Sequence, residues 1–194
     1  MIIEFIDFAQ TAIPSISPYK AKVAQEAVRE FLKGRNTIVL ARRPEVNDIL
    51  QGDIIGPLVF SFIDNDGNLQ TKESYAFVLS NSCDIENDFE IVLCACYPLE
   101  RFSTIFSHIK SENLLKNEYG ALFYITTNSR EDHIACFSDC VTYGRDLIFR
   151  LLKEGRIQRI ASLTQVGWYF FLLKLTYHFM RPEDSETNQN RIVL

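Results

Sequence analysis

One stretch, residues 50–98, constrains the fold more than any other part of the chain. Clusters of turn-forming residues at Asp64–Asn68 and Asn81–Asp84 divide it into three apolar runs of strand length, which are Ile54–Ile63, Ser74–Leu79 and Glu90–Tyr97. Short apolar runs separated by Gly, Asn, Asp and Ser are typical of antiparallel strands joined by turns. The stretch therefore predicts a meander of antiparallel strands.

The N-terminal part of the chain carries the clearest helical pattern. From Tyr19 to Lys33, apolar side chains recur at the spacing of an amphipathic helix. Ser17 suits the N-cap, Pro18 suits the first helical position, and Gly34 suits the C-terminal stop. We therefore expect an N-terminal amphipathic helix of about four turns.

Further helices and strands are expected after the meander. The apolar spacing indicates helices at 100–117, 146–153 and 165–180, and strands at 119–126 and 133–137. A series of strands with helices added around it predicts an α+β fold.

A chain of 194 residues has room for one main domain with appendages. We assign residues 45–182 to this domain and treat the helix expected within 99–117 as an insertion. Residues 1–44 would form an N-terminal extension that contains a short strand and the amphipathic helix. Residues 183–194 are acidic and polar, without an apolar period, and are expected to form a mobile tail.

The net charge and the lengths of the apolar segments argue against several functional classes of protein. The net charge is −5, whereas binding nucleic acid over a whole surface needs a basic face. Met1–Phe8 carries two acids and no base, which does not fit an export signal. The apolar run Val166–Leu173 is too short to span a membrane. Five Cys is an odd number, so we expect reduced thiols in a cytoplasm.

The last expected helix is apolar around nearly its whole circumference. Its large side chains include Trp168, Tyr169, Phe170, Phe171 and Leu172. A helix of this kind must be covered on more than one side. Either it lies between the strands and the N-terminal helix, or one face docks a partner protein. These five residues are therefore candidate partner-binding residues.

Four of the cysteines lie in or beside expected strands. Cys94 and Cys96 are two residues apart, so their thiols point to the same face of a strand. Cys136 and Cys140 follow later, with His133 nearby. Zinc takes such ligands, but usually in pairs around a turn, whereas Cys94 lies inside an apolar run. We favour thiols packed in the core, with no metal and no cofactor.

Cys83 lies in a turn just after a strand, where nucleophiles are often presented, and His108 or His133 could serve as its base. Asn81 and Asp84 are also explained as turn residues whose side chains bond nearby backbone. We favour a structural turn. The alternative is a catalytic group made of Cys83, Asp84, His133 and Arg145.

Several basic residues are scattered in the sequence but could gather on one side of the fold. They are Arg42, Arg43, Lys153, Arg156 and Arg159. We favour a solvated surface, and the alternative is a patch that faces RNA or an acidic partner. The sequence has no phosphate-binding glycine loop and no HExxH-like helix, which lowers the case for a nucleotide enzyme or a metallohydrolase.

Three segments of the meander resemble the PemK/MazF family of small β-barrel toxins in their sequence and their order. They are Gln51–Ile55, Ala76–Asn81 and Glu90–Ala95. Asp139–Thr164, which ends in RIQRIASLT, is similar to the stretch of that family where a last strand and a short helix lead into the closing helix. The resemblance covers residues 51–179 with an insertion at 99–116. It implies a small antiparallel β-barrel with a C-terminal helix, to which the N-terminal amphipathic helix and the inserted helix, both expected from their apolar spacing, would be additions that serve a partner.

Members of this family are mostly dimeric endoribonucleases that cut single-stranded RNA without a metal and are held inactive by an antitoxin. Their catalytic Arg lies in an Arg-Pro just before the apolar strand, where this chain has Ser74 and Tyr75. Their Ser or Thr at the start of the next strand corresponds to Phe89 or Glu90 here. The resemblance therefore implies a retained fold without the nuclease.

These observations lead to the hypothesis of a non-catalytic protein-binding or regulatory subunit of a larger bacterial complex. The expected setting is an antiviral defence or toxin–antitoxin-type system in the cytoplasm. The expected partners are proteins in a hetero-complex, with RNA or DNA reached through that complex and no membrane. One rival is a metal-independent endoribonuclease that uses Cys83, Asp84, His133 and Arg145. Another is an RNA-binding module that uses Arg42, Arg43, Arg156 and Arg159.

Overall fold

The computed structural model describes residues 22, 26, 29, 40–41, 49–126 and 131–180. Within the N-terminal extension, Lys22, Glu26 and Arg29 are helical and exposed. The rest of the expected N-terminal helix, Arg42, Arg43 and the tail expected at 183–194 lie outside the described residues.

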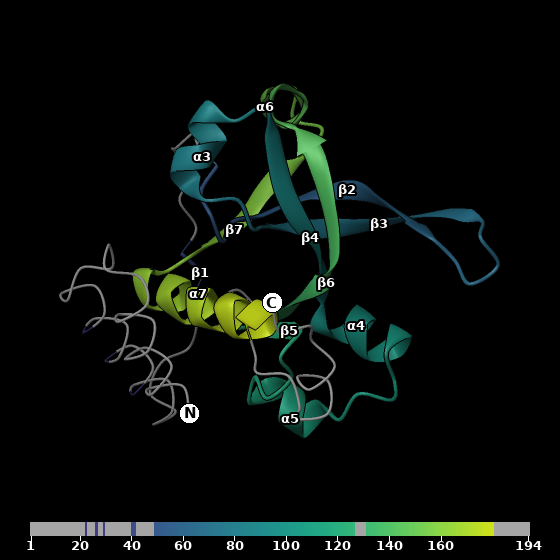
Figure 1. Cartoon of the computed structure of the whole chain (residues 1–194), viewed down its shortest axis with the longest axis vertical. Coiled ribbons are helices and arrows are strands. Elements are labelled where there is room, and N and C mark those ends of the chain that lie inside the picture. Colours follow the sequence, from purple (N-terminus) through teal and green to yellow (C-terminus); the bar gives the residue numbers. More distant parts are fainter. Residues whose placement is uncertain are drawn as a thin grey trace, which may run out of the picture.

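One antiparallel sheet carries the described part of the fold (Figure 1). The order of its seven strands in space is β1-β7-β2-β3-β4-β6-β5. In chain order the strands are β1 (Leu40–Ala41), β2 (Ile54–Ile63), β3 (Leu69–Val78), β4 (Glu90–Pro98), β5 (Leu122–Ile125), β6 (His133–Gly144) and β7 (Gln158–Leu163).

The expected meander is present as β2, β3 and β4. Phe77 of β3 pairs with Ile54 on one side and with Cys94 on the other. The strand β3 starts at Leu69, before the apolar run Ser74–Leu79, because the polar groups of the preceding turn are hydrogen-bonded. Asp64 Oδ1 accepts hydrogen bonds from the backbone N–H groups of Asp66 and Asn68, at 3.0 and 2.8 Å. A tight turn of this kind keeps the polar start of β3 in register with β2.

The described residues from 49 to 180 contain five helices. They are α3 (Ser82–Asn87), α4 (Leu99–Ile105), α5 (Ser111–Leu115), α6 (Arg145–Lys153) and α7 (Gln165–Met180). The prediction of a single helix at 100–117 was wrong, because this segment forms two separate helices, α4 and α5. At the division, the Phe106 ring packs 4.7 Å from the Phe102 ring and 6.0 Å from the Tyr97 ring. These contacts hold the chain where α4 ends.

Both faces of the sheet are buried, because alternate side chains of a strand point to opposite sides. On one face, Leu93 and Ala95 of β4 belong to a core that includes Phe102 of α4, Leu114 of α5 and Ile148 of α6. On the other face, the thiols of β4 belong to a core that includes side chains of α7. The central strands are therefore apolar on both sides, unlike strands with one solvated face.

The helix α7 covers the second face of the sheet. Phe171 is fully buried, with its ring centroid 5.0 Å from that of Phe77 and 6.0 Å from that of Phe137. Lys174 is also buried, and its Nζ donates to the carbonyl oxygens of Asn117 and Tyr119 at 2.7 and 2.6 Å. The helix is thus covered by the sheet on one side and by the connection between α5 and β5 on another.

The sheet is open in the described part of the chain. Its edges are β1, which pairs with β7, and β5, which pairs with β6. The expected α+β class is confirmed, whereas the expected closed barrel is not. Among the described residues, none of the helices has the length and the apolar character that a membrane span requires.

Candidate functional site

An open cleft of about 760 Å³ lies where the last turns of α7 meet the sheet. Its apolar walls are formed by Leu79, Val92, Phe137, Leu175 and Phe179. The volume falls in the range of small-molecule binding pockets. Phe179 is 68% exposed and therefore offers much of its ring to a bound molecule. Exposed aromatic side chains are enriched in protein interfaces.

Polar groups form the rim of the cleft. They belong to Ser80, Asn81, Asp84, Ser138, Cys140 and His178. Ser80 Oγ accepts from the backbone N–H of Val92 at 2.8 Å, and Cys140 Sγ donates to the carbonyl of Phe137 at 3.1 Å. Burial, and then the nearby charge of Asp139, raise the pKa of the Cys140 thiol, so the thiol is kept protonated. These bonds fix the shape of the rim and give it little nucleophilic character.

An irregularity in β6 shapes one wall of the cleft. Cys140 pairs with Cys94 of β4, but the next pair joins Cys136 to Ala95, so the residues between them bulge out of the ladder. The bulge presents Phe137 to α7, where its ring centroid lies 5.8 Å from that of His178. It also carries Asp139 toward the other face of the sheet, where Asp139 pairs with Lys72 and accepts a hydrogen bond from the Tyr97 hydroxyl at 3.2 Å.

The lining of the cleft limits what it can bind. Among the described residues, its lining contains Asp84 and His178 as titratable groups beside the Cys140 thiol, and no Lys or Arg. A phosphate backbone is bound mainly through Lys and Arg, and the described lining offers neither. Apolar walls with a rim of short hydrogen-bonding groups suit a segment of another protein.

Two of the candidate catalytic residues lie at or beside this cleft. The segment expected as a turn at Asn81–Asp84 begins the short helix α3, and Asn81 is its N-cap, with Oδ1 accepting from the backbone N–H of Cys83 at 2.9 Å. The structural role expected for Asn81 is confirmed. Asp84 lines the cleft, and Cys83 is exposed on the same helix.

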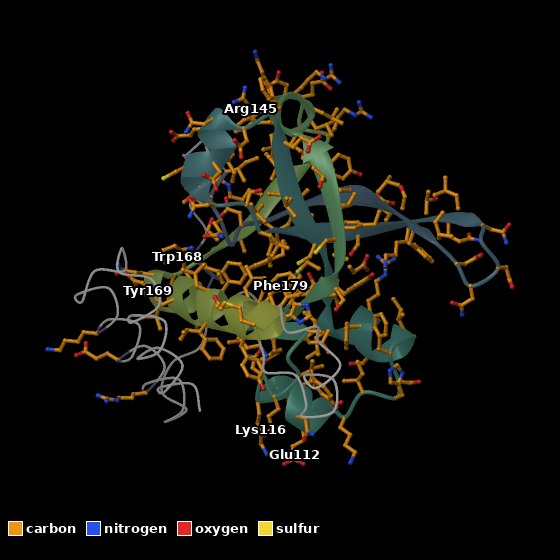
Figure 2. All side chains as sticks on the ribbon, viewed as in Figure 1. Glu112, Lys116, Arg145, Trp168, Tyr169 and Phe179 are labelled. Carbon is orange, nitrogen blue, oxygen red and sulfur yellow. The ribbon has the colours of Figure 1, made fainter. Side chains whose placement is uncertain are left out.

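The other two candidate catalytic residues lie at opposite ends of the β4–β6 ladder. Arg145 follows Gly144, which pairs with Glu90, and its Nη1 donates to the carbonyl of Glu86 on α3 at 2.8 Å (Figure 2). His133 pairs with Pro98 at the far end of β4. It is buried, its ring packs 5.8 Å from that of Tyr75, and burial lowers its pKa. The structure brings Arg145 to α3 but leaves His133 away from it.

The cysteines of the expected metal alternative are packed in the core. Cys94, Cys96 and Cys136 are buried, and Cys140 is exposed at the cleft. Burial raises the pKa of Cys94 and Cys96 well above the usual value and that of Cys136 to about 12. Thiols of this kind stay protonated, whereas a metal needs thiolates. Among the described residues, no three His, Cys, Asp or Glu side chains gather as metal ligands would.

The basic residues of the RNA-binding alternative have different surroundings. Arg159 Nε lies 3.3 Å from Asp53 Oδ2, and its side chain is mostly buried. Arg156 is exposed, with Nη1 3.9 Å from Glu154 Oε2. Lys153 is exposed at the end of α6. Arg159 is therefore committed to a structural ion pair, and Arg42 and Arg43 lie outside the described residues.

The positions that correspond to the catalytic pair of the PemK/MazF family are also apart. Ser74 is buried, and its Oγ donates to the carbonyl of Cys96 at 2.9 Å. Tyr75 pairs with Cys96 near the end of β4, whereas Glu90 begins β4 and Phe89 is 87% exposed just before it. Neither pair of side chains forms a joint site.

The residues expected to bind a partner lie in the N-terminal half of α7, where Figure 2 labels Trp168 and Tyr169. Tyr169, Phe170 and Phe171 are buried within the chain, and Trp168 and Leu172 are half-buried. Trp168 Nε1 donates to Gln51 Oε1 at 3.0 Å. Their partner-binding role stays a prediction, and in this structure they contribute to the core.

The exposed apolar surface of α7 lies at its other end, at Phe179 and Met180. Sequence reasoning did not select Phe179, Leu175 or His178. The spacing of Leu175 and Phe179, four residues apart on one helical face, was the signal that could have pointed to this end. The contribution of the β6 bulge had no comparable signal.

Comparison with protein-family models and with curated proteins gives no match for this chain. The resemblance to PemK/MazF proteins therefore rests on the sequence segments alone and stays a prediction.

Proposed function

We propose that this chain is a non-catalytic protein-binding or regulatory subunit of a larger bacterial complex, and that the cleft beside α7 binds its protein partner. The composition of the cleft supports this proposal, because its apolar walls end at the exposed Phe179 and none of the described residues that line it is Lys or Arg. The separation of His133 from Cys83 and Asp84 adds support, since a base at that distance cannot activate a nucleophile on α3.

A PemK/MazF-like scaffold is part of the same proposal. The order of β2, β3 and β4, followed by the closing helix α7, supports it. The open sheet departs from the closed barrel of that family. We further propose a cytoplasmic hetero-complex in an antiviral defence or toxin–antitoxin-type system, in which any RNA or DNA is bound through the partner.

The test is co-expression of the tagged chain with the products of its neighbouring genes. We expect a complex of fixed stoichiometry that Phe179→Asp disrupts, because a carboxylate would be desolvated in the apolar cleft. Phe89→Asp is the matched control, since Phe89 is also an exposed aromatic residue but lies outside the cleft. A stable monomer that retains no co-expressed protein, or a complex that Phe179→Asp leaves intact, would contradict the proposal.

The rival nuclease is tested with the purified chain and a long single-stranded RNA. The proposal predicts no cleavage above that of a buffer control. Defined cleavage that disappears in Cys83→Ala or Asp84→Ala, two residues of α3, would replace it with the endoribonuclease.

A further inference from the structure

Two cysteines lie directly opposite each other in the sheet, Cys94 on β4 and Cys140 on the neighbouring strand β6 (Figure 1). Cys140 is exposed and lines the cleft together with Leu79 and Phe137. Cys94 is buried in the core cluster that contains the same two residues, so both cysteine side chains are on the face that α7 covers. The sheet therefore pairs a thiol of the cleft with a thiol of the core.

The backbone contacts of β4 identify these two cysteines as a non-hydrogen-bonded pair. The carbonyl of Val92 accepts from the backbone N–H groups of Leu79 and Ser80, at 3.0 and 3.2 Å, and its own N–H donates to Ser80 Oγ at 2.8 Å. The polar groups of Val92 are thus directed toward the end of β3 and away from β6. Because their direction alternates along a strand, the polar groups of Cys94, two residues on, are also directed away from β6.

The spacing of such a pair suits a disulfide. The Cα atoms of a non-hydrogen-bonded pair are about 4.5 Å apart, and a disulfide needs Cα atoms about 4.4–6.8 Å apart. Directly opposite Cβ atoms are usually separated by about 4.5–5.5 Å, and by less in a pair of this kind, whereas a disulfide needs about 3.5–4.5 Å. The bond therefore requires a small approach of the two strands, and the resulting strain would make it easy to reduce.

The other three cysteines have no such partner. Cys96 lies opposite Ala135. Cys136 lies opposite Ala95, and it belongs to the core on the other face of the sheet. Cys83 lies on α3, outside the sheet. The β4–β6 pair is therefore the only place in the described sheet where two thiols lie directly opposite each other.

We propose that Cys94 and Cys140 are a redox pair that forms a reversible disulfide at the rim of the cleft, with a low-molecular-weight disulfide such as oxidised glutathione as the oxidant. Cys140 Sγ attacks one sulfur of the oxidant and forms a mixed disulfide, and the glutathione that leaves takes the proton of Cys140. Cys94 Sγ then attacks Cys140 Sγ, and the second departing glutathione sulfur takes the electron pair and the proton of Cys94. Two thiols are thus oxidised to one disulfide, and the oxidant is reduced to two thiols.

The protonated state of Cys140 limits the rate of the first step. Burial, and then the nearby charge of Asp139, raise the pKa of this thiol, and only the thiolate attacks a disulfide. Oxidation should therefore be slow at neutral pH and faster at about pH 9. This protonation limits the rate of the exchange, so the test is run to equilibrium.

The test is thiol counting and peptide mass mapping of the purified Cys83→Ser chain after equilibration with excess oxidised glutathione at about pH 9 and an acid quench. The Cys83→Ser background removes an exposed thiol that would form mixed disulfides. We expect the loss of two thiols per chain and a peptide pair cross-linked through Cys94 and Cys140. Excess reduced glutathione should restore both thiols.

Three variants in the same background locate the cross-link. Cys96→Ser is the matched control, because Cys96 lies on the same face of β4 as Cys94 but opposite an alanine, and it should leave the cross-link intact. Cys140→Ser should prevent the loss of thiols. Cys94→Ser should hold Cys140 as a mixed disulfide with glutathione.

The parent Cys83→Ser chain decides the test even where Cys94→Ser misfolds, because peptide masses distinguish a mixed disulfide from a cross-link. A parent chain that keeps all its thiols, or that holds Cys140 only as a mixed disulfide, would overturn the proposal.

The position of the redox pair links the cleft to oxidation, and this link rests on the proposed function. A bound partner would cover Cys140, and exchange needs access to the attacking thiol, so the co-expressed complex should be cross-linked at least about tenfold more slowly than the chain alone. Equal rates would count against partner binding in the cleft. The cross-link in the chain alone tests the redox pair by itself, so the two failures are distinguishable.

Discussion

Asp53 and Arg159 form an ion pair in the core, with Arg159 Nε 3.3 Å from Asp53 Oδ2. Asp53 is fully buried just before β2, and Arg159 lies on β7 opposite Ile55. Asp53 Oδ2 also accepts from the backbone N–H of Leu50 at 3.0 Å. The pair therefore ties the start of the meander to the last strand of the sheet.

Arg159→Met is expected to lower the free energy of unfolding by about 3–5 kcal/mol, because it leaves a buried carboxylate without its guanidinium. Urea denaturation measures the loss. Arg156→Met is the control, since its ion pair with Glu154 is exposed and should contribute less than about 1 kcal/mol. Equal losses in the two variants would show that the buried pair adds nothing to stability.

Gly52 occupies a position that other residues should not tolerate. Its φ is +89°, and a Cβ there would lie 2.6 Å from Leu163 Cδ1. Gly67 has a similar φ of +83° but no atom within 4 Å of a Cβ. Gly67→Ala is expected to cost about 1 kcal/mol of stability from backbone strain alone. Gly52→Ala should cost at least about 1 kcal/mol more from overpacking. Thermal unfolding of both variants checks the difference, and equal melting temperatures would refute the steric argument.

Lys174 predicts a pH dependence of stability. Burial lowers its pKa from 10.5 to about 8 in the folded chain. Between these values the unfolded chain binds the proton more strongly, so the free energy of unfolding rises with pH in this window and falls as pH is lowered toward 8. The rise should reach up to about 3 kcal/mol. It is measured as the difference in the free energy of unfolding between the wild type and Lys174→Met at each pH, because the contributions of the other titrating groups cancel in this difference.

Lys116→Met is the control for this pH dependence. Lys116 is exposed, and its Nζ pairs with Glu112 Oε1 at 2.7 Å. Figure 2 labels both side chains near α5. This variant should keep the rise of stability between pH 8 and 10.5. If the free energy of unfolding of the wild type and of Lys174→Met changed with pH in parallel, the lowered pKa of Lys174 would be contradicted.

The thiols should differ sharply in reactivity. Cys83 is exposed, whereas Cys94, Cys96 and Cys136 are buried with raised pKa values. An aromatic disulfide reagent at neutral pH should label Cys83 first, and Cys83→Ser should remove the fast phase. The three buried thiols should react only after denaturation. Fast labelling of Cys94 in the folded chain would mean that the sheet opens readily.

The meander could be predicted because its strands and turns differ in composition. The turn-forming residues Asp64–Asn68 and the apolar run of β2 are compatible with few other secondary structures. The helix α3 could not be predicted as a helix, since Asn81 and Asp84 are equally common in turns and at N-caps. The burial of Phe170 and Phe171 follows from the all-round apolar pattern of α7, but that pattern does not say which face meets the sheet.

The cleft could not be predicted from the sequence, for a different reason. Its wall depends on where β6 leaves the ladder between Cys136 and Cys140, and bulges of this kind depend on pairing across strands. The ion pair of Asp53 with Arg159 likewise joins residues far apart in the chain. In the sequence, Arg159 was therefore grouped with surface arginines.

The partner-binding role of the cleft is tested most directly by hydrogen exchange in the purified complex. Backbone amides of Leu79–Asp84 and of the end of α7 should exchange more slowly in the complex than in the chain alone, because the partner covers them. The turn at Asp64–Asn68 lies outside the cleft and should exchange equally in both states. Unchanged exchange around the cleft, with protection confined to other segments, would contradict the account.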